Sequence, residues 1–163
     1  MLKPYDYSSS STSLVAIFFS GGGLVACVFA SWLVDKTKKF NLVMQCCAVL
    51  SIIMTALMFL SLPTESPWIL GANALGIGIG MFPVINISYN YLVELTYPIS
   101  AAMSNGAMSW FQMVVSTVMS VAVTEFINKW GPDSALWTFL IMESISLVAL
   151  LFVKQDLRRL EAE

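Results

Sequence analysis

The chain has 163 residues, of which 58% are hydrophobic and 11% are charged, with eight Lys and Arg, ten Asp and Glu, no His and a formal net charge of -2. Soluble domains carry about 25% charged residues, so this composition excludes an ordinary water-soluble domain. The lack of a basic excess excludes a nucleic-acid-binding protein, and the lack of histidine removes the usual catalytic triads and zinc sites. We therefore expect an integral membrane protein that is not an enzyme and that uses no cofactor or metal.

Long stretches with almost no charge predict an all-α membrane protein with five transmembrane helices. A helix of roughly 20 residues, rising 1.5 Å per residue, crosses the hydrocarbon core of a bilayer. The expected helices are residues 13–34, 41–62, 68–93, 102–126 and 134–153. The expected connections are an extracellular lead-in at 1–12, a cytoplasmic loop at 35–40, an extracellular turn at 63–67, a cytoplasmic loop at 94–101, an extracellular loop at 127–133 and a cytoplasmic tail at 154–163.

The distribution of positive charge predicts the orientation of the chain. One side of the membrane would carry Lys36, Lys38, Lys39, Lys154, Arg158 and Arg159, and the other only Lys3 and Lys129. Cytoplasmic loops are enriched in Lys and Arg, so the N-terminus is expected outside and the C-terminus in the cytoplasm. The chain is then a multi-pass protein of the plasma membrane or of an organelle membrane, with the lipid bilayer as its first partner.

Small residues in the first and third spans predict helices that pack closely. The first span contains the run Gly21–Gly23, and the third contains Gly76, Gly78 and Gly80 followed by Pro83. Small residues let helix backbones approach each other in lipid. The Gly-x-Gly-x-Gly pattern follows no strand, so we interpret it as a flexible or kinked membrane helix and not as a nucleotide-binding loop.

Polar side chains in the third and fourth spans are candidates for a transport pathway. Gln112, Ser116 and Ser120 repeat every four residues and share one face of the fourth span. Such a stripe fits either hydrogen bonding between helices or the lining of a cavity, and the sequence leaves both open. The candidates for the substrate cavity are Gln112, Asn86, Asn90, Tyr89 and Trp110.

Glu143 is a carboxylate inside the last span. An unpaired charge at the centre of a membrane helix costs about 2.5 to 3.5 kcal/mol on insertion scales. We expect Glu143 to face the bundle, protonated or hydrogen-bonded to serines such as those of the fourth span. The alternatives are that it couples transport to protons, or that it reaches water through a local defect.

Three sequence motifs resemble those of a known family. Residues 31–39, a small residue followed by Asp35 and then lysines, resemble the loop motif of the major facilitator superfamily. Residues 92–98, Leu-Val-Glu-Leu-Thr-Tyr-Pro, together with Ser104-Asn105-Gly106 and the closing residues 154–159, are similar to the feline leukaemia virus subgroup C receptor family of that superfamily. The motifs have the order and spacing of that family.

The resemblance implies the fold and the function class. It matches the five spans to helices eight to twelve of a twelve-helix transporter, which form most of the C-terminal half of a major facilitator fold. It implies transport of a small organic metabolite such as choline, ethanolamine or haem. It also implies a partial chain, whose partners would be the small-molecule substrate and the missing N-terminal helices or an equivalent half. The alternative is a remnant that does not transport and packs with other membrane proteins.

The resemblance also assigns roles to single residues. It implies a gating loop at Asp35, Lys36 and Lys39, in which the acid meets the N-terminal end of a helix in the opposite half, and a family motif at Glu94, Thr96, Tyr97 and Pro98. The family's carboxylate in helix ten falls at Asn90, and its glutamine in helix eleven falls at Met113. Gln112 is one position earlier and thus rotated by about 100° around the helix.

Overall fold

The computed structural model describes residues 9–61, 66–131 and 133–153. These residues form α1 (Ser9–Thr37), α2 (Phe40–Ser61), α3 (Pro67–Leu95), α4 (Ala101–Trp130) and α5 (Asp133–Phe152). Each helix is long and apolar enough to cross a membrane, which confirms the predicted all-α fold with five spans. Parts of the predicted lead-in, of the turn at 63–67 and of the loop at 127–133, and the whole tail at 154–163, lie outside the described residues.

The helices continue beyond the apolar spans expected from the sequence. α1 begins at Ser9 and not at residue 13, and α4 ends at Trp130 and not at residue 126. The expected bounds followed the loss of hydrophobicity, whereas helical hydrogen bonds continue into polar flanks. α4 begins where the Ser100 side chain accepts from the Met103 backbone N–H, and it ends at Gly131, whose φ of 88° suits glycine.

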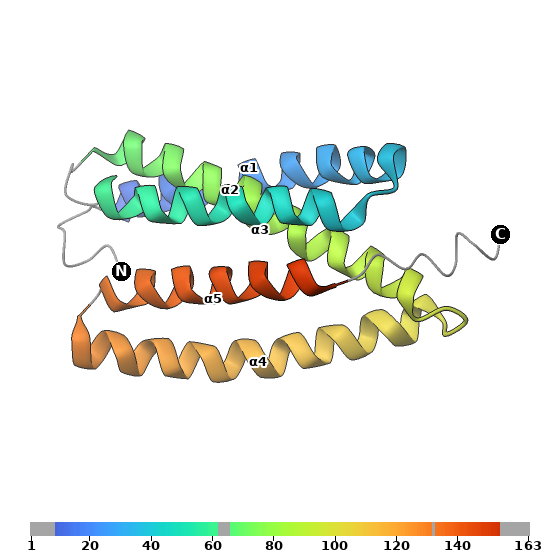
Figure 1. Ribbon diagram of the computed structural model, residues 1–163. Helices are drawn as coiled ribbons and strands as arrows, with labels where there is room; N and C mark the ends of the chain where they lie inside the picture. The colour runs from blue at the N-terminus through green and yellow to red at the C-terminus, as the bar shows by residue number, and fades with distance from the viewer. Residues whose placement is uncertain (1–8, 62–65, 132, 154–163) are drawn as a thin grey trace.

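The five helices form two groups (Figure 1). α3 crosses obliquely behind α2 and leads through a short loop into α4, while α4 and α5 form a hairpin below the other three helices. α3 packs most extensively against α1 and next against α2, and α2 also contacts α5. α4 contributes little to the interior, since Ser104 is its one buried residue among those described.

Close approach of helix backbones explains the glycines of α3. A Cβ atom on Gly78 would collide with the backbone carbonyl oxygen of Phe19 on α1. A Cβ atom on Gly80 would lie 2.8 Å from the carbonyl oxygen of Cys47 on α2 and 2.7 Å from the backbone nitrogen of Ser51. α3 is therefore held between α1 and α2 at distances that only glycine permits, in agreement with the close packing predicted from the small residues.

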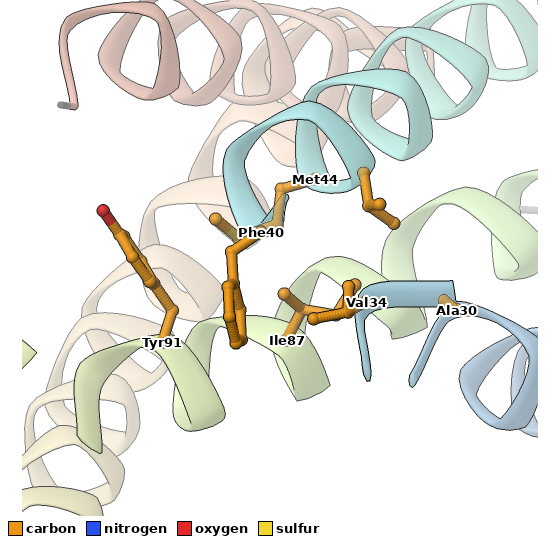
Figure 2. Packing of buried hydrophobic residues seen from close by; sticks show 7 residues of the cluster. Ala30, Val34, Phe40, Met44, Ile87 and Tyr91 are labelled. Atoms are coloured by element: carbon orange, nitrogen blue, oxygen red, sulfur yellow. The ribbon is translucent and has the colours of Figure 1, made fainter. Parts of the chain in front are cut away.

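Two apolar clusters hold the bundle. The larger joins α1, α2 and α3 near the 38–39 loop and consists of Ala30, Val34, Phe40, Val43, Met44, Ile87 and Tyr91 (Figure 2). Within it the rings of Phe40 and Tyr91 stack with centroids 5.6 Å apart. The smaller cluster joins α3 to α5 through Leu70 and Leu136.

Amide side chains fasten the end of α5 to the start of α2. Asn41 Nδ2 donates to the carbonyl oxygen of Val153 at 2.6 Å, and Gln45 Nε2 donates to that of Leu150 at 3.3 Å. The last carbonyls of a helix have no partner within the helix, and in lipid they find no water. The two amides of α2 therefore satisfy groups that would otherwise be costly to place in a membrane.

Candidate functional site

A polar cluster joins α3 to α4 and contains two of the predicted cavity residues. The Tyr89 hydroxyl donates to Gln112 Oε1 at 2.7 Å and lies 3.1 Å from Ser109 Oγ. Ser109 Oγ in turn donates to the backbone carbonyl of Asn105 one turn earlier, at 2.8 Å. The cluster is partly exposed, so its hydroxyl and amide groups remain accessible from the open side of the helix pair.

The geometry of α4 separates Gln112 from its neighbour Met113. Gln112 faces α3 and reaches Tyr89, whereas the Met113 side chain is 73% exposed. The rotation expected between adjacent positions therefore brings Gln112, and not Met113, to the polar face. Further along the stripe, Ser116 and Ser120 are exposed.

A second polar region lies between α1, α3 and the start of α4. It is a cavity of about 460 Å³ whose lining includes Asp35, Lys38, Asn90, Glu94 and Asn105. Glu94 Oε2 and Asn105 Oδ1 are buried and have no hydrogen-bond partner among the described residues. The cavity thus brings the predicted Asn90 together with the carboxylate residues Asp35 and Glu94.

The other predicted residues lie around these two regions. Asn86 Nδ2 donates to Ser31 Oγ at 3.1 Å, which ties α3 to α1. The Lys36 ammonium lies 5.1 Å from the ring centroid of Trp32, a cation–π contact on α1. Lys39 is exposed in the loop, and the Trp110 side chain is 70% exposed on α4. The structure thus brings Tyr89 and Gln112 together, while Asn86 contacts α1 and Asn90 lines the second polar region.

Residues 96–100 form the link between α3 and α4 and include Thr96, Tyr97 and Pro98, which were assigned to a motif by resemblance. Thr96 Oγ1 donates to the Leu92 carbonyl at 2.8 Å and lies 2.6 Å from Ser104 Oγ. Tyr97 and Pro98 are exposed in the loop that follows α3. Thr96 therefore caps the end of α3 and contacts the buried Ser104 near the start of α4.

Glu143 faces the bundle, but its partner differs from the serines suggested by the sequence. Ser51 Oγ on α2 donates to Glu143 Oε1 at 2.5 Å. The fourth span does not supply this serine, because α5 packs against α2 on the face that carries Glu143, while α4 lies on another side of α5. Ser51 was not singled out from the sequence, where nothing distinguishes it from other serines in the spans.

Asn105 and Ser109 were also not named as candidates, although a signal for them exists. Asn105, Ser109 and Gln112 follow one another at intervals of four and three residues, the spacing of one helical face. Steps of three and then four residues from Gln112 toward the start of the helix reach Ser109 and Asn105, whereas the four-residue step used for the stripe reaches Met108 and Ser104. Ser31 carries no comparable pattern, and only the packing of α1 on α3 places it near Asn86.

Comparisons with known proteins agree with the motifs. No protein-family model matches the chain. It is 23% identical over 137 residues to the choline/ethanolamine transporter FLVCR2 of Rattus norvegicus, covering 84% of this chain and 25% of the relative. It is 25% identical over 165 residues to the choline/ethanolamine transporter flvcr2a of Danio rerio, covering 99% of this chain and 34% of the relative. An uncharacterised transporter of the major facilitator type from Caenorhabditis elegans is 21% identical over 165 residues, covering 99% of this chain and 28% of the relative.

The sequence identity to these relatives is low, but the matches consistently cover most of this chain. The chain matches a C-terminal portion of the choline/ethanolamine transporters, and it spans between 25% and 34% of the length of these relatives. These matches confirm the resemblance to the feline leukaemia virus subgroup C receptor family. Together with the five apolar helices, they identify a multi-pass integral membrane protein similar to major facilitator transporters.

Proposed function

We propose that this chain forms part of a membrane transporter of the major facilitator type, and that its substrate is a small organic ammonium of the choline and ethanolamine class. The observation that carries the proposal is the Tyr89–Gln112 pair, which places a hydroxyl, an amide and an aromatic ring together at the junction of α3 and α4. The names of the relatives support the substrate class.

The chemistry of the pair suits an ammonium alcohol. The Tyr89 ring offers a π face for the cation, and the Gln112 amide and the Ser109 hydroxyl can bond a substrate hydroxyl. The neutral ligand set binds the cation without trapping it by a full opposite charge. This suits a transporter, in which the substrate must also leave.

We propose that the α1–α2 and α3–α4 loops and the C-terminus face the cytoplasm. The support is the excess of Lys and Arg on that side, including Lys36, Lys38 and Lys39 in the first loop. In a protein whose three native cysteines are alanine, a cysteine at Ser66 should react with an impermeant maleimide only from outside. Reaction only from the cytosol would reverse the assignment.

The transport test uses the 163-residue chain in liposomes, alone and together with the N-terminal region of the rat relative that this chain does not match. Uptake of labelled choline is expected in the combined arm, because the remainder of the cavity would come from other helices. Uptake by the chain alone would support the substrate class and contradict the need for a second half. No uptake in either arm, with both proteins inserted, would overturn the proposed function.

Two variants locate the pathway in the combined arm. Gln112→Ala should lower uptake about tenfold, the effect of one lost hydrogen bond of roughly 1.4 kcal/mol. Met113→Ala is the matched control, since its side chain is exposed one position away. Equal uptake by the two variants would remove Gln112 from the pathway.

A further inference from the structure

A long apolar groove lies between α1 and α2 and shares no lining residue with the two polar regions. It has a volume of about 810 Å³, and its lining comes from α1, α2 and α3. α1 and α2 each pack extensively on α3 but contact each other little. They therefore form the walls of the groove, and α3 forms its floor. None of the lining residues that the structure describes is charged.

The groove is long enough to hold an acyl chain of a membrane lipid. Its α1 wall runs from Ile17 to Leu33, a length of about 24 Å at 1.5 Å per residue. This exceeds one leaflet, which is half of a hydrocarbon core of about 30 Å. The wall is open to the membrane, since the Val25 and Phe29 side chains are 61% and 69% exposed. Apolar walls alone do not select one lipid over another, so any selection must come from the end of the groove.

Lys36 extends the α1 wall at that end. Phe29, Trp32 and Lys36 follow one another at intervals of three and four residues, and the first two line the groove. The Lys36 ammonium lies 5.1 Å from the ring centroid of Trp32, which holds it at the rim. An ammonium has three N–H donors, so this contact leaves donors for a phosphate oxygen.

Lys39 extends the α2 wall at the same end. Leu42 and Val43, three and four residues later, both line the groove. The Val43 backbone N–H donates to the Lys39 carbonyl at 3.3 Å, so Lys39 belongs to the first turn of α2 and shares their face. The Lys36 and Lys39 side chains are exposed, and Asp35 lines the polar cavity between α1, α3 and α4 instead of this groove.

We propose that this groove binds an anionic phospholipid, with one acyl chain along α1 and with the phosphate headgroup held by Lys36 and Lys39. A role in topology alone would not require the two lysines to continue the two walls of one groove. Phosphatidylcholine carries the same phosphate but also an ammonium, which weakens its attraction to the lysines. The inference goes beyond the proposed function, because it concerns a lipid at other residues and requires no transport.

The test measures which lipid lies against Trp32. The 163-residue chain, with its other four tryptophans replaced by phenylalanine, is placed in phosphatidylcholine vesicles that contain increasing amounts of a lipid with brominated acyl chains, which quench tryptophan fluorescence on contact. An anionic headgroup gains about fivefold in affinity from each nearby lysine. Half-maximal quenching of Trp32 should therefore need at least fivefold less brominated phosphatidylglycerol than brominated phosphatidylcholine.

A second protein that keeps only Trp110 is the matched control. Trp110 is 70% exposed, and α4 carries no Lys or Arg before Lys129. The two brominated lipids should quench it equally. Each tryptophan is compared with itself in the two lipids, so its depth in the membrane cancels. The orientation of the chain has no effect either, since both leaflets have the same composition.

Substitution of the lysines tests the headgroup site. Lys36→Gln together with Lys39→Gln should abolish the preference at Trp32, whereas Lys129→Gln at the other end of the bundle should leave it unchanged. Native mass spectrometry of the chain with all five tryptophans, released from detergent with equal amounts of the two lipids, provides a second readout. It should show phosphatidylglycerol bound to this chain, and less of it bound to the double variant.

Four results would overturn the proposal. Equal quenching of Trp32 by the two lipids would show that the groove selects no headgroup, and an undiminished preference in the double variant would show that the lysines do not hold it. Loss of the preference in inorganic phosphate would show that the lysines bind a soluble anion without the groove. Loss of it on adding the N-terminal region of the rat relative would assign the groove to another helix. None of these results depends on whether the chain transports choline.

Discussion

Substituting Gly78 by alanine tests the packing of α3 on α1, the most extensive helix contact in the protein. The added Cβ would collide with the Phe19 carbonyl oxygen and lie 3.1 Å from the carbonyl carbon. These are backbone atoms, so no side-chain rotation can relieve the collision. The two helices must move apart.

The expected magnitude follows from that displacement. Restoring an ordinary contact requires a shift on the order of 1 Å, and a gap of that size removes about a quarter to a half of the dispersion attraction across an interface. Overpacking of this kind costs about 1 to 3 kcal/mol, while the better helix propensity of alanine returns up to about 1 kcal/mol. We expect Gly78→Ala to destabilise the protein by about 1 to 2 kcal/mol.

Gly21→Ala is the matched control on the partner helix. A Cβ on Gly21 meets no atom of the described residues within 4 Å, so only the propensity gain of up to about 1 kcal/mol remains. Reversible unfolding of both variants in mixed micelles gives the difference directly. If Gly78→Ala is as stable as Gly21→Ala, then α1 and α3 do not approach each other as closely as described, and the reasoning from the glycine pattern fails.

Three further predictions concern the loops and helix ends. In a transporter completed by the opposite half, Asp35→Asn should slow transport and shift cysteine labelling toward the inward-open form by up to about thirtyfold. This is the effect of losing up to about 2 kcal/mol of interaction with a helix N-terminus. An unchanged labelling pattern would mean that the loop only determines the membrane topology. A double-mutant cycle of Thr96→Val and Ser104→Ala should give a coupling free energy of about 0.5 to 1.5 kcal/mol in micelle unfolding, and additive effects would show that their 2.6 Å contact does not link α3 to α4. Asn41→Leu should cost only about 1 kcal/mol, because the lost bond to the Val153 carbonyl is partly offset by removing the buried Asn41 Oδ1, which has no hydrogen-bond partner among the described residues. Hydrogen exchange should accelerate in the last turn of α5 and not in its first, and uniform acceleration would contradict a local role.

Composition and periodicity sufficed for much of the fold. The number and approximate extent of the spans follow from hydrophobicity, because lipid requires a helix of about 20 apolar residues for each crossing. The glycines of the third span indicated closely packed neighbouring helices, since a missing Cβ matters only where another backbone comes near. The helix ends were less predictable, because hydrogen bonding carries α1 and α4 into their polar flanks.

The pairing of polar side chains was partly predictable from the sequence. Helical spacing places Asn105, Ser109 and Gln112 on one face of α4. Adjacent positions point in different directions around a helix, so Met113 does not share the face of Gln112. Periodicity fixes the direction of a side chain relative to its own helix. It does not state which helix lies opposite.

The tertiary structure alone decided the partners. Ser51 and Glu143 are 92 positions apart in the sequence, and only the packing of α5 against α2 brings the hydroxyl to the carboxylate and away from the serines of α4. In lipid, any helix face with small or polar residues can pair with several others at similar free energy, so the choice depends on the fit of whole surfaces and not on the pattern of one segment.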